Sequence, residues 1–140
     1  MERMHAAWNG LLIGFPVLIA HLALTTGLLI VGLAVYARVA HYHEVARLRE
    51  GNVAAAIILS GQMLALAIPL SAMLANSVNA PEIVLWGIVT VILQFIASIS
   101  LRLLLPGLPG RVARGEIASS LVYACGQVVT GLITAAALSG

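Results

Sequence analysis

The sequence has 140 residues, of which 61% are hydrophobic and 9% are charged, and its formal net charge is +2. A soluble domain is roughly half apolar and about a quarter charged. This composition therefore excludes an ordinary soluble domain and predicts an all-α membrane protein.

Four stretches are long and apolar enough to cross a bilayer, which takes about 20 residues in a helix. We expect four transmembrane helices near residues 10–36, 52–76, 83–105 and 116–138, and no stretch alternates in the pattern of membrane strands. The first apolar run exceeds the ~7–15 residues of a signal peptide core, so we expect it to stay attached. Residues 1–140 then form a single membrane domain.

Basic residues are concentrated in the two longer links between these spans, and all seven of them are arginines. Because basic residues in short loops resist translocation, we expect both links in the cytoplasm and both termini in the periplasm. The arginines are split between two short loops, so they do not indicate nucleic acid binding. The six that flank these links are Arg38, Arg47, Arg49, Arg102, Arg111 and Arg114.

The two halves of the chain have related sequences. A shift of 65 positions aligns Arg49 with Arg114 and the pair Gly61-Gln62 with Gly126-Gln127. This periodicity predicts an internal repeat, with repeat one at about 10–76 and repeat two at about 83–138. Since each repeat holds two spans, both copies enter the membrane from the same side. We therefore expect two parallel two-helix repeats.

Small residues also recur in the second and fourth spans, seven, four and seven positions apart, which places them on one helix face. In lipid, close approach through small residues holds helices together. We therefore expect each of these spans to carry a helix-packing stripe. The predicted stripes are Ala54, Gly61, Ala65 and Ala72 in the second span, and Ser119, Gly126, Thr130 and Ala137 in the fourth.

The cytoplasmic openings of these two spans share an acidic residue and a glycine. Glu50 and Glu116 stand near predicted helix N-termini, where the helix dipole stabilises negative charge, and Asn52 suits the first turn. Gly51 and Gly115 allow each link to turn sharply. The alternative hypothesis is that the carboxylates attract cations to a cytoplasmic mouth.

Two segments resemble the small bacterial inner-membrane proteins of the YjfL type, domain-of-unknown-function family 350 (DUF350). They are "REGNVAAAIILSGQMLALAIPL" (49–70) and "LWGIVTVILQFIASISLRLLLPGL" (85–108). The resemblance implies the four-span fold and an inner-membrane location. Such proteins often occur beside phage-shock-protein-A-like and glutathionylspermidine-synthase-like proteins, which implies envelope-stress partners. The second repeat reads "RGEIASS" where the first reads "REGNVAAA", so a ligand role for Asn52 would be absent from it.

Each span carries one strongly hydrogen-bonding residue about eleven positions from its start, which is roughly 16 Å deep at 1.5 Å per residue. A polar side chain facing lipid tails is unfavourable, so these residues should meet one another, another subunit or water. One hypothesis is an interhelical hydrogen-bond layer. The other is a polar constriction with a protonatable gate at the histidine. The predicted midplane polar layer comprises His21, Gln62, Gln94 and Gln127.

The sequence offers little for catalysis or cofactors. There is no aspartate, no phosphate-binding loop and no Gly-x-Ser-x-Gly motif. A bis-histidine haem site needs two histidines at one depth, which His21 and His41 do not provide. In "HYHE" (41–44) the two histidines point to different helix faces, which disfavours a metal site. We expect no cofactor and no enzymatic activity.

These patterns predict a non-enzymatic inner-membrane protein that acts in envelope maintenance or stress response through assembly. Its expected partners are the lipid bilayer, further copies of itself as a homo-oligomer, and envelope-stress proteins. The alternative is an oligomeric channel or pore lined by the midplane polar layer. The two hypotheses differ in ion flux across liposomes.

Overall fold

The computed structural model describes residues 1–39 and 43–140, and within them every regular element is an α-helix. His41 and the rest of 40–42 lie outside this description. The four long helices confirm the predicted all-α fold, and each is long and apolar enough to cross a membrane. They are α1 (Glu2–Val39), α3 (Val53–Asn76), α4 (Ala80–Leu104) and α6 (Ile117–Ser139); α2 (His43–Arg49) and α5 (Leu108–Ala113) are short.

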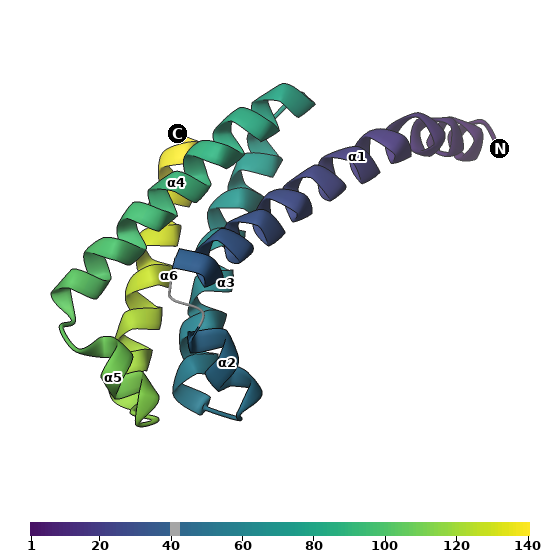
Figure 1. Ribbon diagram of the computed structural model, residues 1–140. Helices are drawn as coiled ribbons and strands as arrows, with labels where there is room; N and C mark the ends of the chain where they lie inside the picture. The colour runs from purple at the N-terminus through teal and green to yellow at the C-terminus, as the bar shows by residue number, and fades with distance from the viewer. Residues whose placement is uncertain (40–42) are drawn as a thin grey trace.

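The two short helices end in the same way, and each ending directs the chain into a long helix (Figure 1). Gly51 and Gly115 have φ of 81° and 73°, a left-handed conformation that glycine adopts without strain. The next N–H in each case reaches back to an arginine carbonyl, from Asn52 to Arg47 and from Glu116 to Arg111, both at 3.0 Å. This pattern is a Schellman motif, which satisfies the last carbonyls of each short helix.

Helices α3 and α6 form the most extensive contact in the bundle. They run side by side in the same direction (Figure 1), and glycines bring their backbones together. A Cβ added to Gly61 would lie 2.6 Å from the Cβ of Ala124, and one added to Gly131 would lie 2.7 Å from the carbonyl oxygen of Ala65. Such close approach is how apolar helices gain contact energy in lipid.

Helix α1 is divided into a packed and an unpacked half. Its C-terminal half lies on α3 and α4, where Gly32 meets Leu66 and Val91 and where Tyr36 is 2% exposed. Its N-terminal half leaves the bundle (Figure 1), and no residue from 1 to 20 is even partly buried. The helix is 38 residues long, or about 57 Å at 1.5 Å per residue, which exceeds the thickness of a bilayer core, ~30 Å.

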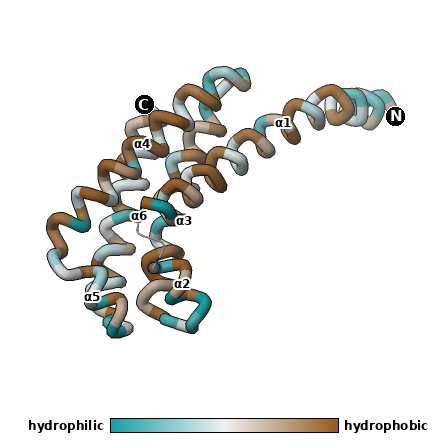
Figure 2. Tube along the Cα trace, viewed as in Figure 1, coloured by the Kyte–Doolittle hydropathy of each residue, from teal (hydrophilic) through white to brown (hydrophobic). Residues whose placement is uncertain are grey.

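Polar residues gather at the two ends of the bundle. Figure 2 shows hydrophobic residues along all four long helices and hydrophilic residues around α2 and α5. We call the end of the bundle that carries α2 and α5 the link end. The opposite end, where residues 77–79 join α3 to α4, is the turn end. The arginine distribution predicts that the link end is cytoplasmic.

Candidate functional site

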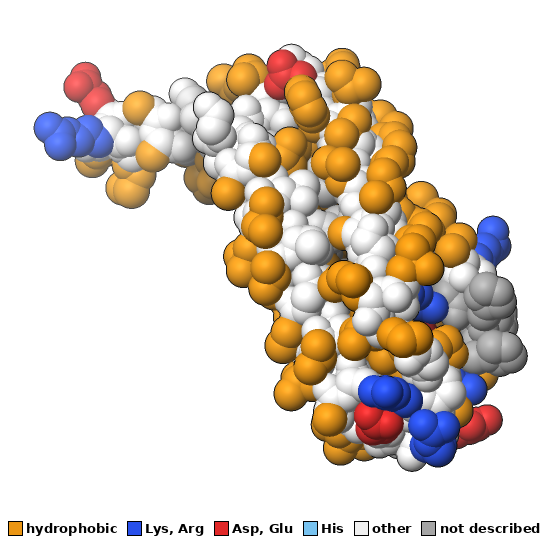
Figure 3. Space-filling model, turned by 90° about the vertical axis from the view of Figure 1, so that its left-hand side faces the viewer, with side chains coloured by type: hydrophobic (Ala, Val, Ile, Leu, Met, Phe, Trp, Pro, Cys, Tyr) orange, Lys and Arg blue, Asp and Glu red, His pale blue; other side chains and the backbone are white. Residues whose placement is uncertain are grey.

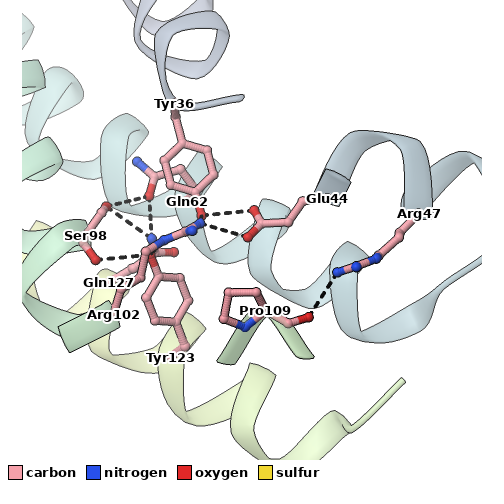
Figure 4. Close-up of polar contacts among 9 residues, drawn as sticks. All are labelled: Tyr36, Glu44, Arg47, Gln62, Ser98, Arg102, Pro109, Tyr123 and Gln127. Carbon is pink, nitrogen blue, oxygen red and sulfur yellow. Dashed lines mark hydrogen bonds and ion pairs between the residues drawn. The ribbon is translucent and has the colours of Figure 1, made fainter. Parts of the chain in front are cut away.

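Three glutamines are buried between α3, α4 and α6, and two of them bond to each other. Gln62, Gln94 and Gln127 are each 1% exposed. The side-chain amide of Gln127 donates to Gln62 Oε1 and, at 3.2 Å, to Ser98 Oγ. Ser98 Oγ also donates to Gln62 Oε1 at 3.0 Å (Figure 4). Helices α3, α4 and α6 thus each supply one side chain to this hydrogen-bonded cluster.

The third glutamine extends this contact toward the turn end. Gln94 Oε1 accepts a hydrogen bond from Thr130 at 3.3 Å, and its Nε2 lies 3.5 Å from Thr134 Oγ1. Hydrogen bonds of this kind between membrane helices contribute about 0.6 kcal/mol each. Two buried atoms, Gln62 Nε2 and Gln127 Oε1, have no hydrogen-bond partner among the described residues. An unpaired buried polar atom costs about 1–3 kcal/mol, so the layer contributes little net stability.

The structure does not bring His21 to these glutamines. Leu28, seven residues further along α1, packs against Gly87, whereas Gln94 lies seven residues beyond Gly87 on α4. His21 and Gln94 are therefore about 20 Å apart along the helix axes. His21 is half-buried and lies nearer to the turn end. The expected depth of His21 in the membrane assumed that every span starts at the membrane boundary. Helix α1, however, begins at Glu2 and packs only through its C-terminal half.

The predicted packing stripe of α3 lies at the contact with α6, but that of α6 does not face α3. Gly61 and Ala65 meet Ala124 and Gly131 of α6. Gly126 instead approaches Leu101 of α4, and Thr130 bonds to Gln94 of α4. Helix α6 has α3 on one side and α4 on another, so its small residues serve two neighbours. Of the other stripe residues, Ala54 and Ser119 are buried, Ala72 is half-buried and Ala137 is exposed.

The three residues at the predicted helix openings have different roles. Asn52 is the N-cap of α3: its Oδ1 accepts from Ala55 N–H at 3.0 Å, and its Nδ2 donates to the carbonyl of Val112 at 2.9 Å. It thereby joins the two links. Glu116 is the N-cap of α6 without a side-chain cap bond, and its carboxylate lies 3.7 Å from Arg111. Glu50 lies exposed in the turn before Asn52.

An ion pair between buried Glu44 and half-buried Arg102 closes the link end of the bundle. Arg102 Nη2 of α4 lies 2.7 Å from Glu44 Oε1 of α2, and Glu44 is 7% exposed. Arg102 also donates to the hydroxyl groups of Tyr36 and Tyr123, both at 3.1 Å, and its guanidinium lies 5.6 Å from both ring centroids. Together these four residues connect α1, α2, α4 and α6 (Figure 4).

This ion pair joins the glutamine layer through a tyrosine. The hydroxyl of Tyr123 donates to the carbonyl of Ser98 at 3.3 Å, and that of Tyr36 donates to Glu44 Oε2 at 3.3 Å. The sequence had indicated Arg102 only as a topology signal. Its position within the apolar run "LRLLL" (101–105) was the available hint, because an arginine among apolar helix residues needs a partner.

The site as a whole is a set of polar contacts between helices. Its members are amides, hydroxyl groups and one neutralised ion pair. Among the residues that the structure describes, no three histidine, cysteine, aspartate or glutamate side chains are grouped so as to hold a metal ion. What this arrangement does physically is lock the link end of α1 and α2 to the three-helix core.

Comparison with known proteins places this fold in a family. The family model described as Domain of Unknown Function (DUF350) matches residues 10–138. The UPF0719 inner membrane protein YjfL of Escherichia coli K12 is 24% identical over 120 residues, which cover 86% of this chain and 91% of that protein. The YjfL protein of Escherichia coli O157:H7 matches equally. No solved structure matches the chain. The chain therefore belongs to the DUF350 family of membrane proteins.

Proposed function

We propose that this protein is a non-enzymatic inner-membrane protein that assembles with copies of itself and acts in envelope maintenance. The observation that carries the proposal is the unpacked N-terminal half of α1. Gly10 and Gly14 lie four positions apart on this half, and a Cβ added to either one would meet no atom within 4 Å.

Two glycines spaced in this way form a contact surface for a second helix. In the Gly-x-x-x-Gly arrangement the missing side chains let two helix backbones approach closely, which is a main source of association in lipid. The glycines of the core, Gly61 and Gly131, already have a helix against them. Gly10 and Gly14 have none among the described residues, so a neighbouring copy of α1 is the partner that the proposal assigns to them.

The role in envelope maintenance rests on family membership. The relative in Escherichia coli K12 is called an inner membrane protein, and the resemblance to the YjfL type implies envelope-stress partners. A protein of this kind acts through contacts in the membrane rather than through turnover. The closed polar contacts of the core support this proposal, because they leave no reactive group facing a substrate.

Oligomer mass in detergent or in nanodiscs tests the assembly. Wild type should be larger than a monomer, and the double variant Gly10→Leu/Gly14→Leu should be smaller. Gly27→Leu is the matched control, since Gly27 also has open space around it but lies on another face of α1. A monomeric wild type, or a double variant of unchanged mass, would contradict the proposal. Restoring resistance to membrane stress in cells that lack the protein tests the envelope role.

A second candidate is a channel in which the glutamine layer forms the polar constriction. The observation in its favour is the pair of unpartnered atoms, Gln62 Nε2 and Gln127 Oε1, which could hydrogen-bond a passing water or ion. The burial of all three glutamines within one chain weighs against a pore between subunits. Ion flux into liposomes separates the candidates: flux that disappears in Gln62→Leu but persists in His21→Leu favours the channel, and absence of flux in wild type excludes it.

A further inference from the structure

The turn end of the bundle contains a cavity that the proposed function does not use. Its volume is about 330 Å³, and three helices line it. The lining includes Met73 and Asn76 of α3, Ser77 directly after it, Glu82 and Trp86 of α4, and Ala137 and Leu138 of α6.

The electrostatics of this cavity favour a cation. Glu82 is the only charged residue in the lining, and its carboxylate is fixed because Oε2 accepts the N–H of Val78 at 3.0 Å. Helix α3 ends at Asn76, so the negative end of its dipole lies at the cavity, while Glu82 in the first turn of α4 offsets the positive end of that helix's dipole. On the face drawn in Figure 3, basic side chains gather at the link end and at the far tip of α1, away from this end.

Two polar residues of the lining offer oxygen acceptors. Asn76 Nδ2 donates to the carbonyl of Ala72 at 2.8 Å, and Ser77 Oγ donates to the carbonyl of Met73 at 2.8 Å. The single hydroxyl proton of Ser77 is therefore used, whereas the amide of Asn76 keeps a second N–H. Asn76 Oδ1 and Ser77 Oγ retain lone pairs, which match an N–H or a positive charge.

The remaining lining residues favour an organic cation over a metal ion. Trp86 presents an indole ring, the aromatic group that attracts ammonium ions most strongly, and Met73 and Leu138 supply apolar walls. A metal ion would need more ligands than this single carboxylate: among the described residues, no three histidine, cysteine, aspartate or glutamate side chains come together. Carboxylate, indole and apolar wall together suit a positive head on a carbon chain.

We propose that this cavity binds an alkylammonium group. The carboxylate of Glu82 pairs with its charge, Trp86 covers it, and the oxygens of Asn76 and Ser77 accept its N–H groups. The group could belong to the ethanolamine head of a phospholipid in the adjoining leaflet or to a free amine. Both sources have the same chemistry, and the experiment below separates them.

Fluorescence of Trp86 provides a direct readout. The chain has two tryptophans, so the Trp8→Phe background leaves Trp86 as the single reporter. The protein is placed in vesicles of phosphatidylglycerol, which contain no ammonium lipid, and is titrated with ethanolamine and with tetramethylammonium. We expect a saturable change in emission. The same ethanolamine titration in phosphatidylethanolamine vesicles should require a higher concentration if the lipid head occupies the cavity, and the same concentration if a free amine does.

Charge variants connect the signal to the cavity. Glu82→Gln should raise the concentration at half-saturation about fivefold, which corresponds to the ~1 kcal/mol of an ion pair at a protein surface. Glu50→Gln is the matched control, since it removes the same charge at the link end. Helix content by circular dichroism establishes that both variants fold, and Glu82→Asp should recover part of the affinity. No saturable change in phosphatidylglycerol vesicles, or wild-type affinity in Glu82→Gln, would overturn the proposal.

Discussion

Helices α3 and α1 are similarly apolar but have opposite surroundings. Both meet the length and hydropathy of a membrane-crossing helix. Yet 50% of the most apolar segment of α3 is buried within the chain, against 11% for that of α1. Hydropathy therefore marks which segments enter the membrane, and it does not distinguish a segment that packs within the chain from one that faces lipid or another copy.

Small and polar residues account for the difference between these regions. In the core, Gly61 and Gly131 contact a neighbouring backbone, and the glutamines bond across helices. In α1, Gly10 and Gly14 have no other helix of the described residues against them. The same residue type thus stabilises the folded chain in one region and leaves an open surface in the other. Substitutions in the two regions should affect different measurements.

The largest effect is expected where the core binds the link end. Arg102→Leu should destabilise the protein by about 3 kcal/mol, because it leaves the buried carboxylate of Glu44 with only the Tyr36 hydroxyl as a partner. Unfolding of detergent-solubilised protein by added SDS measures this loss. The double variant Arg102→Leu/Glu44→Leu should be more stable than the single variant, since no unpaired charge remains. A single variant as stable as wild type would mean that the ion pair does not hold the link end.

A smaller effect is expected from adding one methyl group to a glycine. Gly61→Ala places a Cβ 2.6 Å from that of Ala124, so α3 and α6 must separate, and we expect a loss of about 1–3 kcal/mol. Gly10→Ala meets open space and is the matched control. In SDS unfolding of the monomer it should leave stability unchanged or slightly raised, since alanine favours a helix over glycine. Equal losses in both variants would remove the distinction between core and α1.

The smallest effect is expected in the glutamine layer. Gln127→Met removes bonds worth about 0.6 kcal/mol each, and it also removes the unpartnered Oε1 atom, so the net change should stay below about 1 kcal/mol. A double-mutant cycle with Gln62→Met should give a measurable coupling energy, because the two side chains bond directly. A cycle of Gln127→Met with His21→Leu should give none. Coupling to His21 would contradict the register of α1 described above.

The sequence predicted those features that depend on local composition and on helix starts. Four apolar stretches gave four helices. Gln62 and Gln127 meet because each follows an N-cap that fixes where its helix begins, Asn52 before α3 and Glu116 before α6. His21 has no such turn before it, so counting residues from an assumed boundary misplaced it.

The features that the sequence did not predict depend on which helices become neighbours. The pairing of Glu44 with Arg102 joins residues 58 positions apart, and no periodicity connects them. The small residues of α6 were assigned to one face because they match those of α3, but α6 packs against two helices. The cavity at the turn end likewise combines Trp86 and Glu82 with residues of α3 and α6, and this combination exists only in the folded chain.

The central claim is that the core is complete within one chain while α1 meets another copy through the glycine face. Disulfide formation in native membranes tests it most directly, in a Cys125→Ser background. Val17 lies on the face of Gly10 and Gly14, and Ile19 lies on the opposite face; both side chains are exposed. The account predicts that Val17→Cys forms intermolecular disulfides on oxidation and that Ile19→Cys does not. Equal cross-linking of the two variants, or none in either, would contradict it.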